Sequence, residues 1–433
     1  MTWPFIIIFV GLLLTAWLGI PIGVGLAMIG LAILHFVAGG ATQLAVNAVW
    51  NLFTDFTLSA VPLFIFMGEI LMVSGVSRRI YSGISPFFER IPGRLLHTNI
   101  AVCTVFGSVS GASTSTAAAI GSVAYPELRD RKYHLPTVVG TLAAGGTLGL
   151  LIPPSLSLLI YGATQGVSIG RLFLAGILPG LMFTILFMSA IVVIVKQRPQ
   201  IVPDAIRCTP WVDRISGLAR LWPVVVLAFS VLGTIYLGWA TPTEAAGIGV
   251  VASIVIGFMS GDLTIKKLWG AFHSATFTFG AIMFVAAGAI ILAQSISITG
   301  LPHQLMQGIS ELSLSKYVIL SLVVVIYLCL GCFFDGISLM LMTLPLVFPV
   351  LTGLGFDPIW LGVIITVLIE IGMLTPPVGI NLFVLVGITK GEVSIGEAAR
   401  ATIPFWLILL SGVLILTLAP EIALFLPELV YSQ

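Results

Sequence analysis

The sequence predicts an all-α polytopic membrane protein built as an inverted repeat. Three observations carry this prediction: an apolar composition, clustered basic segments and matched motifs in the two halves. Of the 433 residues, 58% are hydrophobic and only 8% are charged, with a mean hydropathy of +1.17. A soluble domain carries about 25% charged residues, so no soluble core could hide this much apolar surface. The net charge of +1 gives no indication of nucleic-acid binding.

Ten apolar stretches are expected to span the membrane, since each approaches or exceeds the roughly 20 residues that a crossing needs. They cover residues 4–19, 21–38, 56–74, 135–165, 172–196, 221–238, 243–260, 274–296, 359–389 and 400–425. The first stretch has no basic segment before it and no clear cleavage site after it. We therefore expect a retained span rather than a signal peptide.

Two further apolar segments, 98–127 and 318–351, are too long for one crossing and are interrupted by Gly, Ser, Thr or Pro. Each is expected to be a re-entrant hairpin, which enters and leaves the bilayer on the same side. Backbone of this kind is tolerated at membrane depth only where protein or a wet cavity surrounds it.

The basic residues test this layout. Sixteen of the 18 Lys and Arg residues fall in the segments 76–97, 128–134, 196–220, 262–270 and 390–400. Only Arg171 and Lys316 fall in the opposite set of loops. The positive-inside rule makes the five segments cytoplasmic and places both termini outside. This clustering of Lys and Arg on one side holds only if each hairpin leaves the membrane on the side where it enters. The first hairpin then enters from the cytoplasm and the second from outside.

The two halves of the chain repeat each other. SGAS at 110–113 matches DGIS at 335–338, and SGVSRRI at 74–80 corresponds to TGLPHQL at 299–305, both at an offset of 225. Because the charge pattern puts the copies on opposite sides of the membrane, the repeat is inverted, as in many secondary transporters. We expect the first copy at 1–196, a cytoplasmic linker at 197–220 and the second copy at 221–433.

The stretch GSVSGASTSTAAAIG at 107–121 is the most polar one expected at membrane depth. Gly107 and Gly111 would permit a hairpin turn, while hydroxyl and carbonyl oxygens would face a cavity, which suits a hard cation such as Na⁺. The helix after the turn would point its N–H groups at the same spot, which favours a carboxylate. The alternative is a stripe of small residues at a tight helix interface. The matched second copy weighs against it.

In that second copy, GCFFDGIS at 331–338, Asp335 takes the place of Ser110. An acid deep in an apolar segment is costly and indicates function by default. Asp335 could bind Na⁺, carry a proton, or only cap the second helix of the hairpin.

GLLIPP at 149–154 matches GMLTPP at 372–377, at an offset of 223, and each Pro-Pro pair is expected to break its helix. Proline has no N–H, so these breaks free the carbonyls of Gly149, Leu150, Gly372 and Met373. Thr375 adds a hydroxyl, and Ser155, Ser157 and Asn381 fall on the first turns of the second half-helices, whose positive ends can receive an anion. A plain proline kink is the alternative, which the pairing disfavours.

Other polar groups are less informative. Glu69 and Glu370 lie within expected spans and could be ion sites or bind neighbouring polar groups, and Glu244 suits the start of a helix. The sequence has no glycine-rich phosphate loop, no metal spacing among Cys103, Cys208, Cys329 and Cys332, and no histidine mid-span that could activate Ser110 as a nucleophile. We expect neither an enzyme nor a cofactor. A channel is also disfavoured because no filter motif is present.

Four motifs in order carry a family resemblance: GSVSGASTSTAAAIGSVAYPEL, GTLGLLIPPSLSLLIYG, GWATPTEAAGIG and EIGMLTPPVGINLFV. Over nearly the whole chain they resemble the large membrane subunit of TRAP (tripartite ATP-independent periplasmic) transporters. The resemblance implies an elevator-type secondary transporter of the bacterial inner membrane, which imports organic acid anions such as C4-dicarboxylates or sialic acids on a Na⁺ gradient. It also implies two partners, a small four-helix membrane subunit and a periplasmic substrate-binding protein.

The same resemblance implies site residues. One sodium site would use Ser110, Gly111, Ser113 and Gly149, and the other would use Asp335, Gly336, Ser338, Gly372 and Thr375. The substrate would lie between the hairpin tips, where we expect Ser113, Thr114, Ser155, Ser157 and Asn381 to contact it. The hairpins and broken helices would form a mobile transport domain, and the other helices, with amphipathic arms near 42–55, 78–97 and 303–316, the scaffold. The alternative is a stand-alone divalent-anion:Na⁺ symporter with similar paired hairpins.

Overall fold

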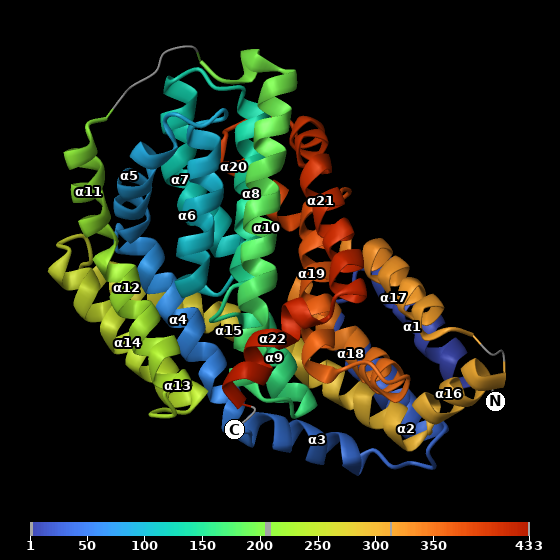
Figure 1. Ribbon diagram of the computed structural model, residues 1–433. Helices are drawn as coiled ribbons and strands as arrows, with labels where there is room; N and C mark the ends of the chain where they lie inside the picture. Colours follow the sequence, from blue (N-terminus) through green and yellow to red (C-terminus); the bar gives the residue numbers. More distant parts are fainter. Residues whose placement is uncertain (1–2, 204–208, 312–313, 432–433) are drawn as a thin grey trace.

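The computed structural model describes residues 3–203, 209–311 and 314–431, and the regular structure of these residues is helical, without strands (Figure 1). Cys208 lies outside the described residues. The first half contains α1 (Trp3–Trp17), α2 (Ile22–Phe36), α3 (Gln43–Thr54), α4 (Ala60–Val73), α5 (Val76–Phe88), α6 (Leu95–Ser110), α7 (Ser113–Asp130), α8 (Leu135–Leu151), α9 (Leu156–Gln165) and α10 (Ile169–Gln197).

The second half begins with α11 (Trp211–Leu218), which lies within the expected linker. It is followed by α12 (Trp222–Ala228), a π-helical segment η4 (Phe229–Gly233), α13 (Thr234–Tyr236), α14 (Pro242–Met259), α15 (Ile265–Ile298), α16 (Leu301–Glu311), α17 (Lys316–Gly331), α18 (Gly336–Gly353), α19 (Pro358–Leu374), α20 (Ile380–Ile388), α21 (Ile395–Leu418) and α22 (Glu421–Tyr431).

Seven helical segments of the described chain are long and apolar enough to cross a membrane. They are Leu135–Gln165, Ile169–Gln197, Trp211–Tyr236, Pro242–Met259, Ile265–Ile298, Gly336–Gly353 and Ile395–Leu418. The pair α3–α4 makes an eighth if its bend of 55° is counted within one span. Several expected spans and hairpin arms, among them α2, α6, α17 and α19, are shorter apolar helices. The chain is therefore a multi-pass membrane protein, with fewer full-length crossings than the ten expected spans.

Some boundaries differ from those expected. The arm predicted at 78–97 ends at Phe88, because the chain turns between Glu89 and Arg94 and the first hairpin helix already begins at Leu95. The span expected at 274–296 is part of α15, a continuous helix of 34 residues. In the first half, the corresponding arm α3 is instead separated from α4 by a bend.

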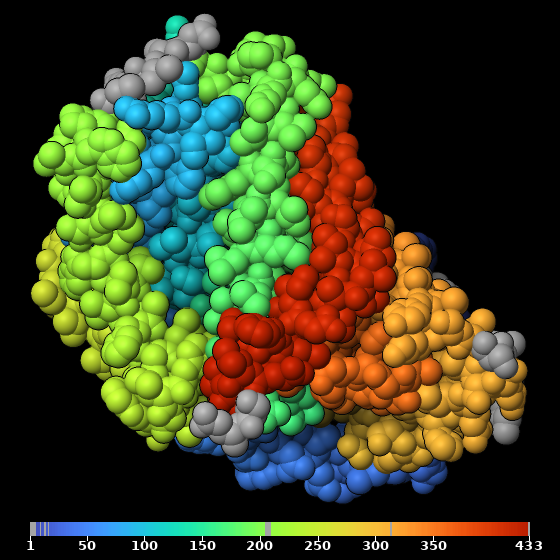
Figure 2. Space-filling view, in the orientation of Figure 1, coloured from blue at the N-terminus to red at the C-terminus, as the bar shows by residue number. Residues whose placement is uncertain are grey.

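The helices form two packed groups. In one, α8 contacts α6, α7 and α21, and α19 contacts α17, α18 and α21, while α8 and α19 also pack on each other. In the other, α15 contacts α2, α3 and α4, and α14 packs on α4. The first group contains both hairpins and both broken helices. Figure 2 shows α10, α21 and α22 side by side on one face of the molecule, in agreement with their mutual contacts.

Four contacts join all five basic segments at the cytoplasmic end predicted from charge. They are Arg79–Asp262 (3.6 Å), Glu89–Arg214 (3.4 Å), the His134 N–H to the Ile201 carbonyl oxygen (3.0 Å) and Arg129–Glu392 (2.6 Å). Each contact links two of the segments 76–97, 128–134, 196–220, 262–270 and 390–400. The segments that the positive-inside rule assigned to one side of the membrane therefore form one connected surface.

Candidate ion and substrate site

The first hairpin tip is a tight turn between α6 and α7. Gly111 ends α6 with φ +69°, a left-handed conformation that favours glycine. The Ser110 and Thr116 hydroxyl oxygens lie 2.6 Å apart, with either able to donate, and the Thr116 hydroxyl is also 2.7 Å from the Ala112 carbonyl oxygen. Ser110 and Ser113 are 2% and 1% exposed. The tip therefore concentrates buried oxygen atoms within a few residues.

The first helix break packs against this tip. The Leu156 N–H donates to the Gly111 carbonyl oxygen at 3.1 Å, so the start of α9 is bonded directly to the turn. Ser155 caps α9 by accepting from the Leu158 N–H at 3.2 Å. The Ser155 hydroxyl also donates to the Leu150 carbonyl oxygen, which the missing N–H of Pro154 leaves without a helical partner. The Leu150 carbonyl oxygen, which the break frees, is thus hydrogen-bonded by a side chain of the break itself.

Close backbone contact holds tip and break together. A methyl group on Gly107 would lie 2.7 Å from Cα of Gly149, closer than real contacts allow. A methyl group on Gly149 would lie 2.8 Å from the Thr116 hydroxyl oxygen and 3.0 Å from the Ala112 carbonyl oxygen. Both glycines are buried inside helices. Their lack of a side chain is what allows the oxygen atoms of the tip to reach the broken helix.

The second hairpin tip repeats this arrangement. The Val378 N–H donates to the Cys332 carbonyl oxygen at 3.1 Å, as the Leu156 N–H does to Gly111. Asp335 is the N-cap of α18, its carboxylate accepting from the Ser338 N–H at 3.0 Å. This is the capping role that the sequence left open for Asp335, although a cap does not exclude a cation on the same carboxylate.

Thr375 lies where α19 ends. Its hydroxyl donates to the Ile371 carbonyl oxygen at 3.1 Å, and its N–H donates to the Gly372 carbonyl oxygen at 3.3 Å. The Cys332 sulfur lies 3.5 Å from the Thr375 hydroxyl oxygen. The second break therefore joins the second tip through a side chain as well as through the backbone.

The two tips differ in exposure. At the first break Pro153, Pro154 and Ser155 are buried. At the second, Pro376 and Pro377 are exposed, and Phe333 in the adjacent tip is 62% exposed. The second tip is thus the open one in this structure.

The two halves of the chain are also tied to each other. Asn381 of α20 donates from its amide to the Ser113 hydroxyl oxygen at 2.6 Å. In return, Tyr161 of α9 donates to the Pro358 carbonyl oxygen at 2.6 Å, and its ring packs edge-on against Phe348. Each second half-helix therefore reaches across to the hairpin and broken helix of the opposite copy.

The structure accordingly gathers the residues expected at the sites into two clusters. The first contains Ser110, Gly111, Ser113, Gly149 and Ser155, joined by Asn381 from the second copy. The second is looser: Asp335 and Ser338 are joined by the cap, a methyl group on Gly336 would meet Ile369 and Met373 of α19, and Gly372 and Thr375 lie at the end of that helix. Thr114 is half-buried on the first turn of α7, and the hydroxyl of Ser157 is buried without a partner among the described residues.

Thr116 belongs to the first cluster although it was not among the expected ligands. Its signal in the sequence is its position three residues after Ser113, which places both on one face of α7.

The three glutamates have different surroundings. Glu69 lies near the Ser274 hydroxyl, and Glu244 forms a capping box with Thr241, so both have polar neighbours. Glu370 is fully buried, and neither carboxylate oxygen has a hydrogen-bond partner in the described part of the chain. The described residues contain no group of three or more His, Cys, Asp or Glu able to hold a metal.

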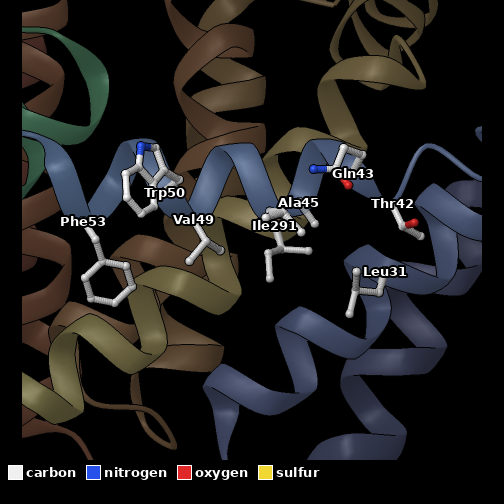
Figure 3. A pocket seen from close by; sticks show the side chains of 9 residues that line it. Leu31, Thr42, Gln43, Ala45, Val49, Trp50, Phe53 and Ile291 are labelled. Carbon is white, nitrogen blue, oxygen red and sulfur yellow. The ribbon is translucent and has the colours of Figure 1, made fainter.

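A cavity of about 690 Å³ lies away from both tips, between α2, α3 and α15 (Figure 3). Its lining is mostly apolar and includes Leu31, Val49, Trp50 and Ile291, none of which was expected at a site. Trp50 is 70% exposed. Aromatic side chains of this kind are typical of membrane interfaces, so we assign this hollow to the lipid-facing surface rather than to the transport site.

The family model for the DctM component of tripartite ATP-independent periplasmic (TRAP) transporters matches residues 6–422. The chain belongs to this family. It is a large membrane component of a TRAP transporter, as its motifs indicated. The large permease protein DctM of the C4-dicarboxylate TRAP transporter from Pseudomonas aeruginosa is 32% identical over 399 residues, covering 92% of each chain. The large permease protein SiaM of the sialic acid TRAP transporter from Vibrio cholerae is 30% identical, covering 95% of each.

A solved structure supports the fold of this TRAP component. The YdaH transporter of Alcanivorax borkumensis matches with a TM-score of 0.61 at 18% identity, over 87% of this chain and 88% of that one. At this identity the likeness concerns the arrangement of helices alone.

Proposed function

We propose that this TRAP component forms the translocation path of a Na⁺-coupled importer for an organic acid anion. The observation that carries the proposal is the repeated bond between tip and break. The Leu156 N–H meets the Gly111 carbonyl and the Val378 N–H meets the Cys332 carbonyl, both at 3.1 Å, and each acceptor is the residue directly after the first hairpin helix. Two matched tip-and-break units of opposite orientation are the arrangement in which secondary transporters hold ions and substrate at mid-membrane.

The sodium ions are proposed to bind at the two clusters. The first offers the hydroxyl oxygens of Ser110, Ser113 and Thr116 beside Gly149, and the second offers the Asp335 carboxylate and the Thr375 hydroxyl. Hard oxygen atoms of this type suit a small hard cation. A Na⁺ ion that enters with the membrane potential gains about 2.3 kcal/mol per 100 mV, which can drive uptake of an anion.

The substrate is proposed to lie between the tips, near Ser113, Thr114, Ser155, Ser157 and Asn381. Neither the tips at 110–113 and 332–335 nor the breaks at 152–155 and 375–379 contain Lys or Arg. An anion would therefore be held by hydroxyl groups, by backbone N–H groups and by the positive ends of α9 and α20. C4-dicarboxylates and sialic acids are the first candidates because relatives at 32% and 30% identity are named for them.

Movement is proposed to follow an elevator scheme. The helix group with α6–α9 and α17–α20 would slide as a transport domain against a scaffold that includes α2, α4, α14 and α15. Support comes from the internal packing of each group. We place the connected basic surface in the cytoplasm of a bacterium and the chain in its inner membrane, with both termini outside.

Two partners complete the proposed importer: a small four-helix membrane subunit and a periplasmic binding protein that delivers the substrate. Both relatives named above are called large permease proteins of TRAP transporters, which supports a smaller companion. The stand-alone symporter is less favoured, because the family match covers residues 6–422.

The test is uptake by proteoliposomes that contain this chain, the small subunit and the binding protein. We expect accumulation of a labelled C4-dicarboxylate or sialic acid under an inward Na⁺ gradient, and none with K⁺ in place of Na⁺. Uptake that ignores Na⁺ would overturn the coupling. Uptake at full rate without the binding protein would favour the stand-alone symporter.

A further inference from the structure

Asn381, proposed above to contact the substrate, also makes a contact between the two halves of the chain. It lies on the first turn of α20, in the second copy, and is fully buried. Its amide nitrogen is 2.6 Å from the Ser113 hydroxyl oxygen and 3.5 Å from the Ala143 carbonyl oxygen, both in the first copy. The remainder of α20 packs on α7 and α8. Asn381 therefore fixes one end of the second break to the first tip.

Among the described residues, no matching bond runs from the first break to the second tip. Counted from the Pro-Pro motif, Leu158 occupies in the first copy the place of Asn381 in the second. Leu158 is fully buried too, but its side chain cannot form a hydrogen bond. The nearest return contact, from Tyr161 to the Pro358 carbonyl, attaches to the start of α19 rather than to the second tip. Within the part of the chain that the structure describes, the first tip is thus held by a polar side chain from the opposite break and the second tip is not.

The hydrogen bonding of the Asn381 side chain is also incomplete. The Asn381 side-chain oxygen is buried without a partner among the described residues. Burying an unsatisfied amide oxygen is costly, so apolar packing alone would favour leucine at this position, as in the first copy. The polar side chain is retained at a cost, which points to a role beyond packing.

We propose that Asn381 is a positioning residue that couples the two ion sites. A cation at the first tip would orient Ser113. Ser113 holds Asn381, and Asn381 holds α20, whose preceding residues include Thr375 of the second site. Once an ion has ordered one site, less free energy is needed to order the other. Each ion therefore raises the affinity of the other site for its own ion. This inference rests on the proposed function, in which both clusters bind Na⁺.

The experiment measures initial uptake against external Na⁺ concentration in proteoliposomes of the whole importer. For the unmodified protein we expect a sigmoidal curve with a Hill coefficient approaching about 2, the limit for two coupled sites. Asn381→Leu, the residue that the first copy uses, should lower the coefficient toward about 1 and raise the half-saturating Na⁺ concentration, because the sites then fill independently. An unchanged Hill coefficient in this variant would overturn the inference. Loss of all Na⁺ dependence in the unmodified protein would instead overturn the proposed function.

Two controls separate coupling from packing. Leu158→Ala removes buried apolar volume at the matched position and should lower thermal stability while leaving the Hill coefficient unchanged. In a Ser113→Ala background, which removes a proposed ligand of the first site as well as the bond, Asn381→Leu should change the remaining Na⁺ dependence no further, because the bond that it would break is already absent. A further rise in the half-saturating Na⁺ concentration in the double variant would show that Asn381 acts by a route other than Ser113, and would refute the proposal.

Discussion

Gly331 and Gly372 touch backbone to backbone: a methyl group on Gly372 would lie 2.7 Å from Cα and 2.8 Å from the carbonyl oxygen of Gly331. Their counterparts in the first copy, Gly107 and Gly149, make the same contact. In each half one glycine belongs to the first helix of the hairpin and the other to the broken helix, four residues before the first proline. The contact sets how near the oxygen atoms of the tip can come to the break.

Gly372→Ala should therefore separate the second tip from its break. Overpacking of this kind costs about 1–3 kcal/mol, and we expect a lower apparent Tm in detergent together with a loss of Na⁺-dependent uptake. Gly247→Ala in α14 is the matched control, because a methyl group there meets nothing within 4 Å. It should preserve transport and stabilise its helix by up to about 1 kcal/mol. Equal stability and uptake in the two variants would contradict the contact.

Asp335 caps α18, and its charged carboxylate is a proposed Na⁺ ligand. Two substitutions separate these two roles. Asp335→Asn keeps an oxygen that can accept from the Ser338 N–H, so we expect near-normal thermal stability but no Na⁺-dependent uptake. Asp335→Ala loses the cap as well, which costs about 0.5–2 kcal/mol, while membrane insertion is retained. Normal uptake by the asparagine variant would reduce Asp335 to a structural cap.

Cys332 reports on the second ion site. It is half-buried and lies 3.5 Å from the Thr375 hydroxyl, whereas Cys103 is fully buried. In a variant with Cys208→Ser and Cys329→Ser, a maleimide should label Cys332 and leave Cys103 unmodified. Na⁺ should slow this labelling because an ion on Thr375 restrains the tip. Labelling at the same rate in Na⁺ and K⁺ would argue against Thr375 as a ligand. The measurement is the rate of mass increase of the intact protein.

The sequence was sufficient to predict the helical class, the family and the positions of both tips and breaks. These follow from local rules: glycine at the Gly111 turn, missing proline N–H groups at both breaks, and apolar runs of measurable length. The basic clusters were equally informative, because Lys and Arg concentrate in the loops on one side of the membrane. The contacts among Arg79, Asp262, Arg129 and Glu392 join segments that the charge pattern had already grouped.

Contacts between distant elements were not predictable from local rules. The bond between Asn381 and Ser113 spans 268 positions and depends on how α20 packs across the repeat. The carbonyl of Leu150 was expected to be available as a ligand, but it accepts the Ser155 hydroxyl, a bond that requires the actual geometry of the break. The sequence contains no signal for the different exposure of the two tips, because exposure depends on which helices cover each one.

The contact between the end of α7 and the loop before α21 provides the last prediction. Glu392, in the loop between α20 and α21, accepts a hydrogen bond from the Tyr125 hydroxyl at 2.7 Å and pairs with Arg129 at 2.6 Å. Tyr125 is 4% exposed, whereas the Arg129 side chain is 55% exposed. Glu392→Ala should cost about 1–3 kcal/mol because it leaves the buried hydroxyl without an acceptor. Arg129→Ala should cost less than about 1 kcal/mol, since exposed ion pairs contribute little.

The test compares the loss of apparent Tm caused by Glu392→Ala with that caused by Arg129→Ala, both measured in detergent at low and at high salt. Tyr125→Phe serves as the control: it removes the donor itself, so Glu392 is left partly solvated and the loss should fall below that of Glu392→Ala. Only the small Arg129 contribution should shrink with salt, because screening acts on exposed charges. If Arg129→Ala proved as damaging as Glu392→Ala, the ion pair rather than the tyrosine would hold the end of α7 to the second copy.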